Sequence, residues 1–175
     1  VLGAENGLHR QWRQTGVVPA AGVIVGTVKA LKYNGGGKEG NLQEENLEAL
    51  KKGIVNLDKH IENMQKFGIN VVVTLNAFAT DTDAEHNFIK EHVEAMGCEF
   101  ALADVWAKGG EGGLLLAEKV LKAIDKERQE FTLTYTDDIS LKEKINAVAV
   151  KIYGADGVNF TPAASKTLDK LEGMG

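Results

Sequence analysis

The stretch GINVVVTLNAFATDTDAE, residues 68–85, contains three structural signals in succession. Gly68 ends an apolar helical repeat and stands where a helix C-cap belongs. Val71–Leu75 is an unbroken run of apolar and β-branched residues, which is typical of a strand buried on both faces. Thr82 and Glu85 have the spacing of a capping box, which predicts the start of another helix. A helix, a buried strand and a second helix therefore follow one another here.

The same alternation extends in both directions from this stretch. Strands are predicted at residues 23–28, 70–75 and 99–105, and helices at residues 42–67, 83–96 and 114–126. The period of the last of these helices predicts that Val120, Leu121 and Ile124 face inward.

The final third of the chain is predicted to be mainly helical. Residues 131–135 are a candidate fourth strand. A capping box at Ser140 and Glu143 predicts a helix that ends at Gly154. Thr161-Pro162 predicts the start of a last helix, because proline is favoured in the first helical turn.

Alternating strands and helices indicate βαβ units, and so an α/β fold with a mostly parallel sheet and helices on both faces. No repeat or linker divides the chain, so we expect the sheet within about residues 1–130 and a helical segment over about residues 131–175. Ligands bind at the carboxyl ends of the strands in such sheets. The loops that follow those ends are residues 29–40, 76–82 and 106–113.

Composition excludes several classes of function. The chain has 175 residues, 43% of them hydrophobic, a net charge of −5 and no basic run, which argues against nucleic acid and against an anionic membrane surface as partners. The lack of a long apolar run, of a signal peptide and of any cysteine besides Cys98 predicts a cytoplasmic protein without disulfides. His86 and His92 are six residues apart, off one helical face, and no zinc motif exists, so no metal site is expected.

Two glycine-rich stretches raise the question of phosphate binding. NGGGK, residues 34–38, fails the P-loop pattern, because Lys32 and Glu39 stand where Gly and Ser or Thr are needed. VWAKGGEGG, residues 105–113, is not a dinucleotide fingerprint, because Leu115 stands at its final glycine position. The first stretch is either a flexible turn or a ligand-facing loop. The second is either an anion-binding loop or a tight turn between strand and helix.

The loop NAFATDT, residues 76–82, directly follows the buried strand. An asparagine in this position can hydrogen-bond the edge of a purine, and Phe78 can cover its face. The alternative is that Asn76 caps a turn, which is the commoner role of such residues. Trp106 is either a packing residue or, because it lies at a strand end, part of a ligand site.

The chain resembles the formate–tetrahydrofolate ligase family. The stretches that carry the resemblance run in family order over nearly the whole chain: GAENG, VIVGTVKALKYNGG, NLEALKKGIVNLDKHIENMQKFG, NAFATDTDAE, VWAKGGEGG, LAEKV, SLKEKI and KIYGADGVNFTP. The resemblance implies a P-loop NTPase-like core and an ATP-dependent ligation of formate to tetrahydrofolate. The reaction yields 10-formyltetrahydrofolate and ADP, passes through formyl phosphate, and uses ATP with Mg²⁺. It also implies small-molecule partners and a homo-oligomer for the full-length protein.

The resemblance implies roles for particular residues. The nucleotide base would lie near Asn76, Phe78 and Asp81, with Trp106, Lys108 and Gly109 beside them, and Phe160 would stack on the pterin ring of the folate.

Departures from the family pattern at Gly26, Ala77 and His86 make the transfer of individual contacts less direct. The family usually has alanine at position 26, often a basic residue at 77, and an aliphatic one at 86.

The resemblance also implies that the family protein is longer than this chain. The P-loop of the family would precede Val1, and a further folate segment would follow Gly175, so an internal fragment truncated at both ends is expected. No catalytic residue is then assigned within the chain, and the isolated fragment is expected to be inactive. The alternative is an α/β domain without any activity of its own.

Overall fold

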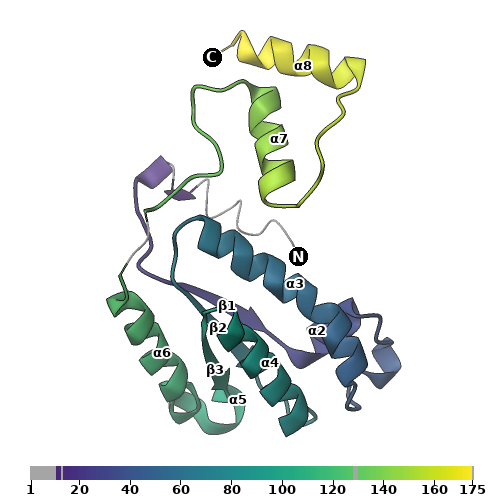
Figure 1. Ribbon diagram of the computed structural model, residues 1–175, viewed down its shortest axis with the longest axis vertical. Coiled ribbons are helices and arrows are strands. Elements are labelled where there is room, and N and C mark those ends of the chain that lie inside the picture. Colours follow the sequence, from purple (N-terminus) through teal and green to yellow (C-terminus); the bar gives the residue numbers. More distant parts are fainter. Residues whose placement is uncertain (1–10, 13, 128–129, 175) are drawn as a thin grey trace. The chain divides into compact units, whose positions relative to one another are not determined.

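The computed structural model describes residues 11–12, 14–127 and 130–174 (Figure 1). The chain divides into two compact units, of which Val18–Phe131 contains the sheet. Its elements are β1 (Gly22–Gly26), α2 (Val28–Asn34), the 3-10 helix η1 (Glu39–Asn41), α3 (Leu47–Lys66), β2 (Val71–Asn76), α4 (Asp83–Ala95), β3 (Glu99–Ala103), α5 (Val105–Lys108), the 3-10 helix η2 (Gly109–Gly113) and α6 (Leu114–Asp125). The other unit contains α7 (Leu141–Lys151) and α8 (Pro162–Glu172). Among the described residues, no helix is long and apolar enough to cross a membrane.

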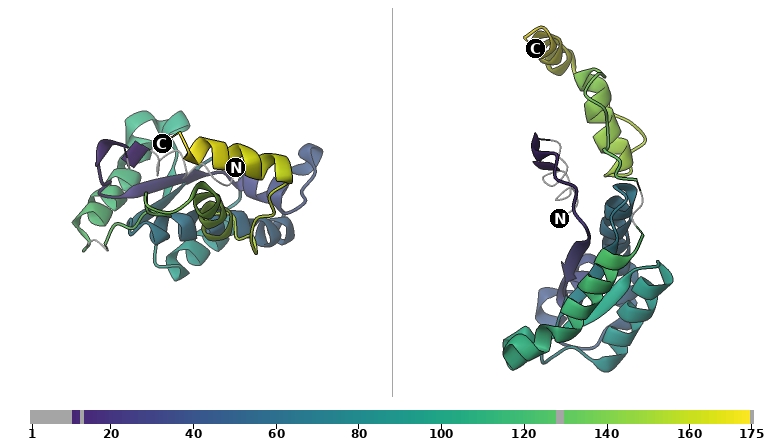
Figure 2. Two further views of the ribbon diagram at one scale, coloured as in Figure 1. Left: turned by 90° about the horizontal axis from the view of Figure 1, so that it is seen from above. Right: turned by 90° about the vertical axis from the view of Figure 1, so that its left-hand side faces the viewer.

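The three strands form a parallel sheet in the order β1-β2-β3, which confirms the predicted architecture. Val71–Leu75 of β2 is buried throughout, and because successive strand side chains point to opposite faces, helices cover both sides of this strand. Helices α3 and α4 lie side by side on one face, and α6 packs against β2 and β3 on the other (Figures 1 and 2). The central strand is therefore the core of the unit.

The predicted helix ends are largely confirmed. Both capping boxes are present: Thr82 and Glu85 start α4, and Ser140 and Glu143 start α7. The side chain of Thr161 accepts the Ala164 N–H at the start of α8. Gly68 and Gly97 adopt positive φ after α3 and α4, with values of 78° and 77°, as helix-terminating glycines do.

The predicted loop at residues 29–40 is wrong over its first part, because Val28–Asn34 forms α2. The Thr27 hydroxyl caps this helix by accepting the Ala30 N–H at 3.1 Å. The helix has only seven residues, and one of its buried positions holds Lys32. A charged residue in a core position hides the apolar period on which a helix prediction depends.

Other predicted bounds also differ. Strand β1 ends at Gly26 rather than at residue 28, because Thr27 caps α2 and Val28 is its first residue. Helix α7 ends at Lys151 rather than at Gly154. Helix α3 begins at Leu47 rather than residue 42, because Asn46 caps it by accepting the Ala49 N–H at 2.9 Å. Strand β3 ends at Ala103, because the chain turns into α5 at Val105. Residues 131–135 form no strand, and the Phe131 ring instead stacks on Phe67 with 6.4 Å between centroids.

A buried ion pair joins α2 to α4. Lys32 and Glu85 are 1% and 0% exposed, and Lys32 Nζ lies 2.9 Å from Glu85 Oε1. Lys32 also donates to the carbonyl oxygen of Glu44 at 2.9 Å. The Glu85 carboxylate accepts two backbone N–H groups, from Asn46 at 3.0 Å and from Thr82 at 3.2 Å. Both charges are thus hydrogen-bonded, which is the condition for burying them.

Two glycines allow α2 and α3 to pack closely. A Cβ at Gly35 would overlap the carbonyl oxygen of Ala49, and a Cβ at Gly53 would overlap that of Leu31. Both positions therefore require glycine, because any side chain would overlap the backbone of the other helix. Helix α2 is thus held against α3 as well as against α4.

Helix α6 is attached to the sheet by a charge cluster. Lys119, Lys122 and Lys126 lie 2.9 to 3.0 Å from the carboxylate of Glu99, the first residue of β3. This rotation of α6 buries Ala123 and leaves Leu121 63% exposed and Ile124 37% exposed, so their predicted inward positions are wrong. Val120 is only partly buried.

The Glu99 cluster makes stability depend on pH. Hydrogen bonds from Lys122 and Lys119, and more weakly from Lys126, outweigh burial and lower the pKa of Glu99 from 4.5 to about 2. Because the folded-state pKa is depressed, this stabilisation is present above about pH 4.5 and is lost as the pH falls toward 2.

We predict that Glu99→Gln lowers the free energy of unfolding by at most about 3 kcal/mol at pH 7. The difference from wild type should shrink steadily as the pH falls from 5 to about 2. Urea unfolding followed by circular dichroism across this range measures it. Glu48→Gln, at a glutamate that is 78% exposed, is the control. A difference that stays constant with pH would contradict the role of the cluster.

Candidate functional site

The carboxyl ends of the three strands meet at one edge of the sheet and enclose a pocket of about 660 Å³. The register places Gly26 beside Leu75 and Asn76 beside Ala103, so the segments that follow the strands are neighbours. The residues lining the pocket come from all three segments: Lys29, Asn76, Ala77, Phe78, Ala79, Thr80, Asp81, Asp83, His86, Leu102, Asp104, Trp106 and Ala107. The topology alone therefore brings these residues together.

A tight turn presents Phe78 to the pocket. The Asp81 carboxylate accepts the Phe78 N–H at 3.0 Å, and the Asp81 N–H donates to the Phe78 carbonyl oxygen at 3.0 Å. The Asp81 side chain is only 1% exposed, whereas Phe78 is 41% exposed. Phe78 is thus held by its own backbone while its ring stays accessible in the pocket, and the Lys29 ammonium lies 4.6 Å from the ring centroid.

Asp81 and His86 form a polar corner of the pocket. Asp81 Oδ2 lies 3.6 Å from His86 Nε2, which is within ion-pair distance when the imidazole is protonated. Asp81 Oδ1 and His86 Nε2 are both buried, and neither has a hydrogen-bond partner among the described residues.

Helix α5 presents the second aromatic ring. Trp106 lies in the first turn of α5 and is 93% exposed. Asp104, the residue before α5, forms an ion pair with Lys108 at 3.2 Å. Phe78 and Trp106 therefore reach the same pocket from two neighbouring strand ends.

The glycines after Trp106 have structural reasons of their own. Gly109 ends α5 with φ 58° and ψ −142°, a conformation that other residues rarely adopt. A Cβ at Gly112 would overlap the carbonyl oxygen of Asp104, and the Gly112 carbonyl oxygen accepts the Asp104 N–H at 3.1 Å. These contacts support the tight-turn interpretation of the stretch. Gly110 is different, because a Cβ there would meet nothing within 4 Å.

The glycines after α2 do not form a phosphate cradle. The N–H groups of Gly35, Gly36 and Gly37 donate to backbone carbonyl oxygens of α2 at distances between 2.8 and 3.1 Å. They terminate the helix, and they are not available to an anion in this conformation. This geometry agrees with the failure of residues 34–38 to match the P-loop pattern, and it supports the turn interpretation of that stretch.

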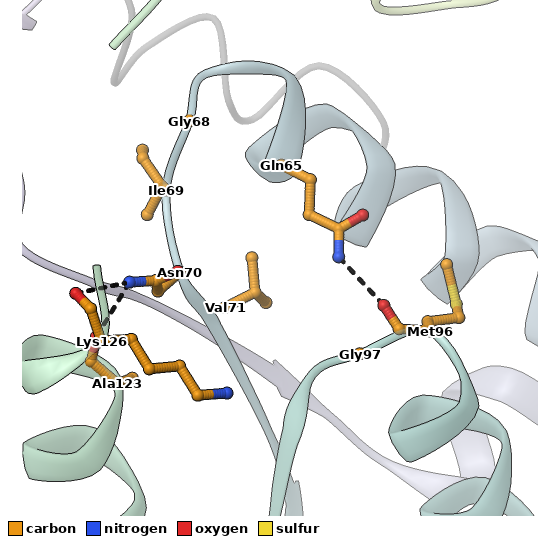
Figure 3. A pocket seen from close by; sticks show the side chains of 9 residues that line it. All are labelled: Gln65, Gly68, Ile69, Asn70, Val71, Met96, Gly97, Ala123 and Lys126. Carbon is orange, nitrogen blue, oxygen red and sulfur yellow. Dashed lines mark hydrogen bonds between the residues drawn. The ribbon is translucent and has the colours of Figure 1, made fainter. Parts of the chain in front are cut away.

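A second cavity, of about 390 Å³, lies at the amino ends of β2 and β3 (Figure 3). Its polar groups bond to the protein itself: Gln65 donates to the Met96 carbonyl oxygen at 3.2 Å, and Asn70 donates to that of Ala123 at 3.1 Å. The Lys126 ammonium that reaches it is held by Glu99. The pocket at the carboxyl edge, which has accessible aromatic rings, is therefore the better candidate for ligand binding.

Within the described residues, no group of three or more histidine, cysteine, aspartate or glutamate side chains is placed to hold a metal ion.

A comparison with protein families gives a match over the whole chain, residues 1–175, to the family model described as formate–tetrahydrofolate ligase. The chain belongs to the formate–tetrahydrofolate ligase family. The proteins of this family are ligases that act on formate and tetrahydrofolate and use ATP.

In this member of the formate–tetrahydrofolate ligase family, four of the six residues predicted at the nucleotide base line one pocket: Asn76, Phe78, Asp81 and Trp106. Lys108 and Gly109 do not line it; Lys108 instead pairs with Asp104, and Gly109 ends α5. Phe160 lies in the other compact unit, just before α8, and its role stays a prediction.

The sequence interpretation missed Lys29, Asp83 and His86 as lining residues. Lys29 was within reach of sequence reasoning, because it is the first residue of the predicted loop 29–40, and because Thr27, which the prediction placed inside a strand, is a good helix cap. Recognising the cap would have placed Lys29 at the first turn of a helix at the binding edge.

We predict that Gly112→Ala lowers the free energy of unfolding by about 1–3 kcal/mol, because the added methyl group forces the backbone at Gly112 away from the Asp104–Val105 peptide at the start of α5. Gly110→Ala is the matched control, and it should change stability by less than about 0.5 kcal/mol. Thermal unfolding measures both variants. Equal effects would show that the two glycines are not distinguished by packing, and that the turn does not depend on the contact between Gly112 and Asp104.

Proposed function

We propose that the pocket at the carboxyl edge of the sheet binds the adenine base of ATP in the ligation of formate to tetrahydrofolate. The observation that carries the proposal is that Asn76, Phe78 and Trp106 line one pocket in a chain of this family. The Asn76 side-chain amide has both a donor and an acceptor, which suits the edge of a purine. Phe78 and Trp106 offer ring faces for stacking, as sites that bind nucleobases commonly do.

The proposed reaction follows the chemistry of the family. ATP, held with Mg²⁺, phosphorylates formate to formyl phosphate, and the folate amine then takes the formyl group to give 10-formyltetrahydrofolate, with ADP and phosphate as the other products. The described residues contribute base binding to this sequence of steps. We assign no catalytic residue among them, and we expect residues 1–175 alone to bind nucleotide without turnover, because phosphoryl transfer depends on positioned charge around the phosphates and residues 1–175 contain no P-loop pattern.

Phe160 is proposed as a stacking partner for the pterin ring of tetrahydrofolate. It is partly buried and precedes Thr161, whose side chain caps α8. The cap fixes the backbone next to Phe160, which favours a defined ring position.

We predict that Phe78→Ala weakens adenosine binding about ten-fold, since stacking on a base contributes roughly 1–3 kcal/mol. Adenosine is titrated into the purified chain, and the amide resonances of residues 76–81 are followed by nuclear magnetic resonance. Tyr33→Ala is the control, because Tyr33 is an exposed ring that does not line the pocket.

The melting temperature of each variant separates binding from packing. A large fall in the melting temperature of Phe78→Ala with unchanged adenosine affinity would show that Phe78 is a packing residue. That result would contradict the base-stacking role. No binding of adenosine to the wild-type chain would contradict the proposed base site as a whole.

A further inference from the structure

Lys29 lines the pocket, and neither the sequence interpretation nor the base-binding proposal gives it a role. It is the second residue of α2, so it lies directly after the carboxyl end of β1 and beside the loop that follows β2. Its ammonium group lies 4.6 Å from the centroid of the Phe78 ring. The side chain is half-buried, and it reaches the pocket from α2, the helix that follows β1.

The charges around Lys29 are unequal. Three carboxylates line the pocket, those of Asp81, Asp83 and Asp104, whereas Lys29 is the one lysine or arginine in the lining formed by the described residues. Asp104 is engaged by Lys108, and Asp81 by the Phe78 N–H. No carboxylate among the described residues lies within ion-pair distance of Lys29, and within that part of the chain the contact of its ammonium is with the Phe78 ring.

We propose that Lys29 binds the phosphate chain of the nucleotide whose base stacks on Phe78. This inference rests on the proposed function, since it requires a base at that ring. A charge-assisted hydrogen bond to a phosphate oxygen is stronger than a cation–π contact at a partly exposed site, so a bound nucleotide draws the ammonium away from the ring. The four-carbon stem of lysine allows that movement without a change in the backbone.

The acidic lining makes this role necessary. An isolated phosphate chain at the pocket would meet the repulsion of the Asp83 carboxylate, which lies in the first turn of α4. The Lys29 ammonium offsets that repulsion and gives nucleotides an advantage over the uncharged nucleoside. Lys29 is therefore a residue that selects for the charge of the ligand, while Asn76 and Phe78 select for its base.

The test compares adenosine with ATP, both free of metal, on the wild-type chain and on Lys29→Met, which keeps the apolar stem and removes the charge. Lys29→Met should weaken ATP binding about ten-fold and change adenosine binding by less than about two-fold. Lys29→Arg should restore most of the ATP affinity, and the dependence of ATP binding on salt should be shallower in Lys29→Met than in wild type. Lys52→Met is the matched control, since Lys52 is exposed on α3 and lines no described pocket.

Three results would overturn the inference. Equal losses for adenosine and ATP would show that Lys29 acts only by supporting the Phe78 ring. Unchanged ATP affinity in Lys29→Met would show that the ammonium does not reach the phosphates. Failure of the wild-type chain to bind adenosine would contradict the proposed function together with this inference, whereas the first two results leave the base site intact. Thermal unfolding of each variant confirms that the comparison is made on folded protein.

Discussion

The buried ion pair between Lys32 and Glu85 is the interaction on which the arrangement of the binding edge depends. Its two charges connect four segments: α2, the turn at Glu44, the N-cap of α3 at Asn46 and the start of α4. Burial raises the pKa of Glu85, but hydrogen bonds from Lys32, Asn46 and Thr82 lower it more, so the net pKa is below the ordinary value. The carboxylate therefore stays ionised inside the protein, and removing either partner would leave an unpaired buried charge.

This pair fixes the pocket from two sides. Lys32 is three residues after Lys29 on α2, and Glu85 closes the capping box at Thr82, directly after the turn that holds Phe78. The side chains that face the pocket can then change rotamer when a ligand binds, while the backbone that carries them stays fixed. A base-binding site that combines exposed rings with a held backbone loses little conformational entropy when a ligand binds.

The sequence predicted the parallel sheet and most helix ends because those depend on local signals. The run Val71–Leu75 has the composition of a doubly covered strand, and the caps at Thr82, Ser140 and Thr161 use side chains that bond within three residues. The meeting of Asn76, Phe78 and Trp106 followed from the rule that parallel strands end at one edge.

The parts that the sequence did not predict depend on pairs distant along the chain. Helix α2 buries Lys32 against Glu85, 53 residues later, and α6 is rotated by lysines that meet Glu99 from a different element. The hydrophobic pattern of a short sequence segment reveals neither of these two pairings. The tight contact of Gly112 with Asp104 is likewise a matter of packing, so the glycine-rich stretch could be interpreted in two ways until its surroundings were known.

A double-mutant cycle on Lys32 and Glu85, measured by urea unfolding at pH 7, tests most directly whether this ion pair holds the binding edge together. Lys32→Met and Glu85→Gln should each lower the free energy of unfolding by about 3–5 kcal/mol, because each leaves a buried charge or polar group without its partner. The double variant should have a free energy of unfolding at least as high as that of the less stable single variant, because both charges are then gone. Losses that simply add in the double variant would show that the two residues act independently, and would contradict a binding edge that depends on their pairing.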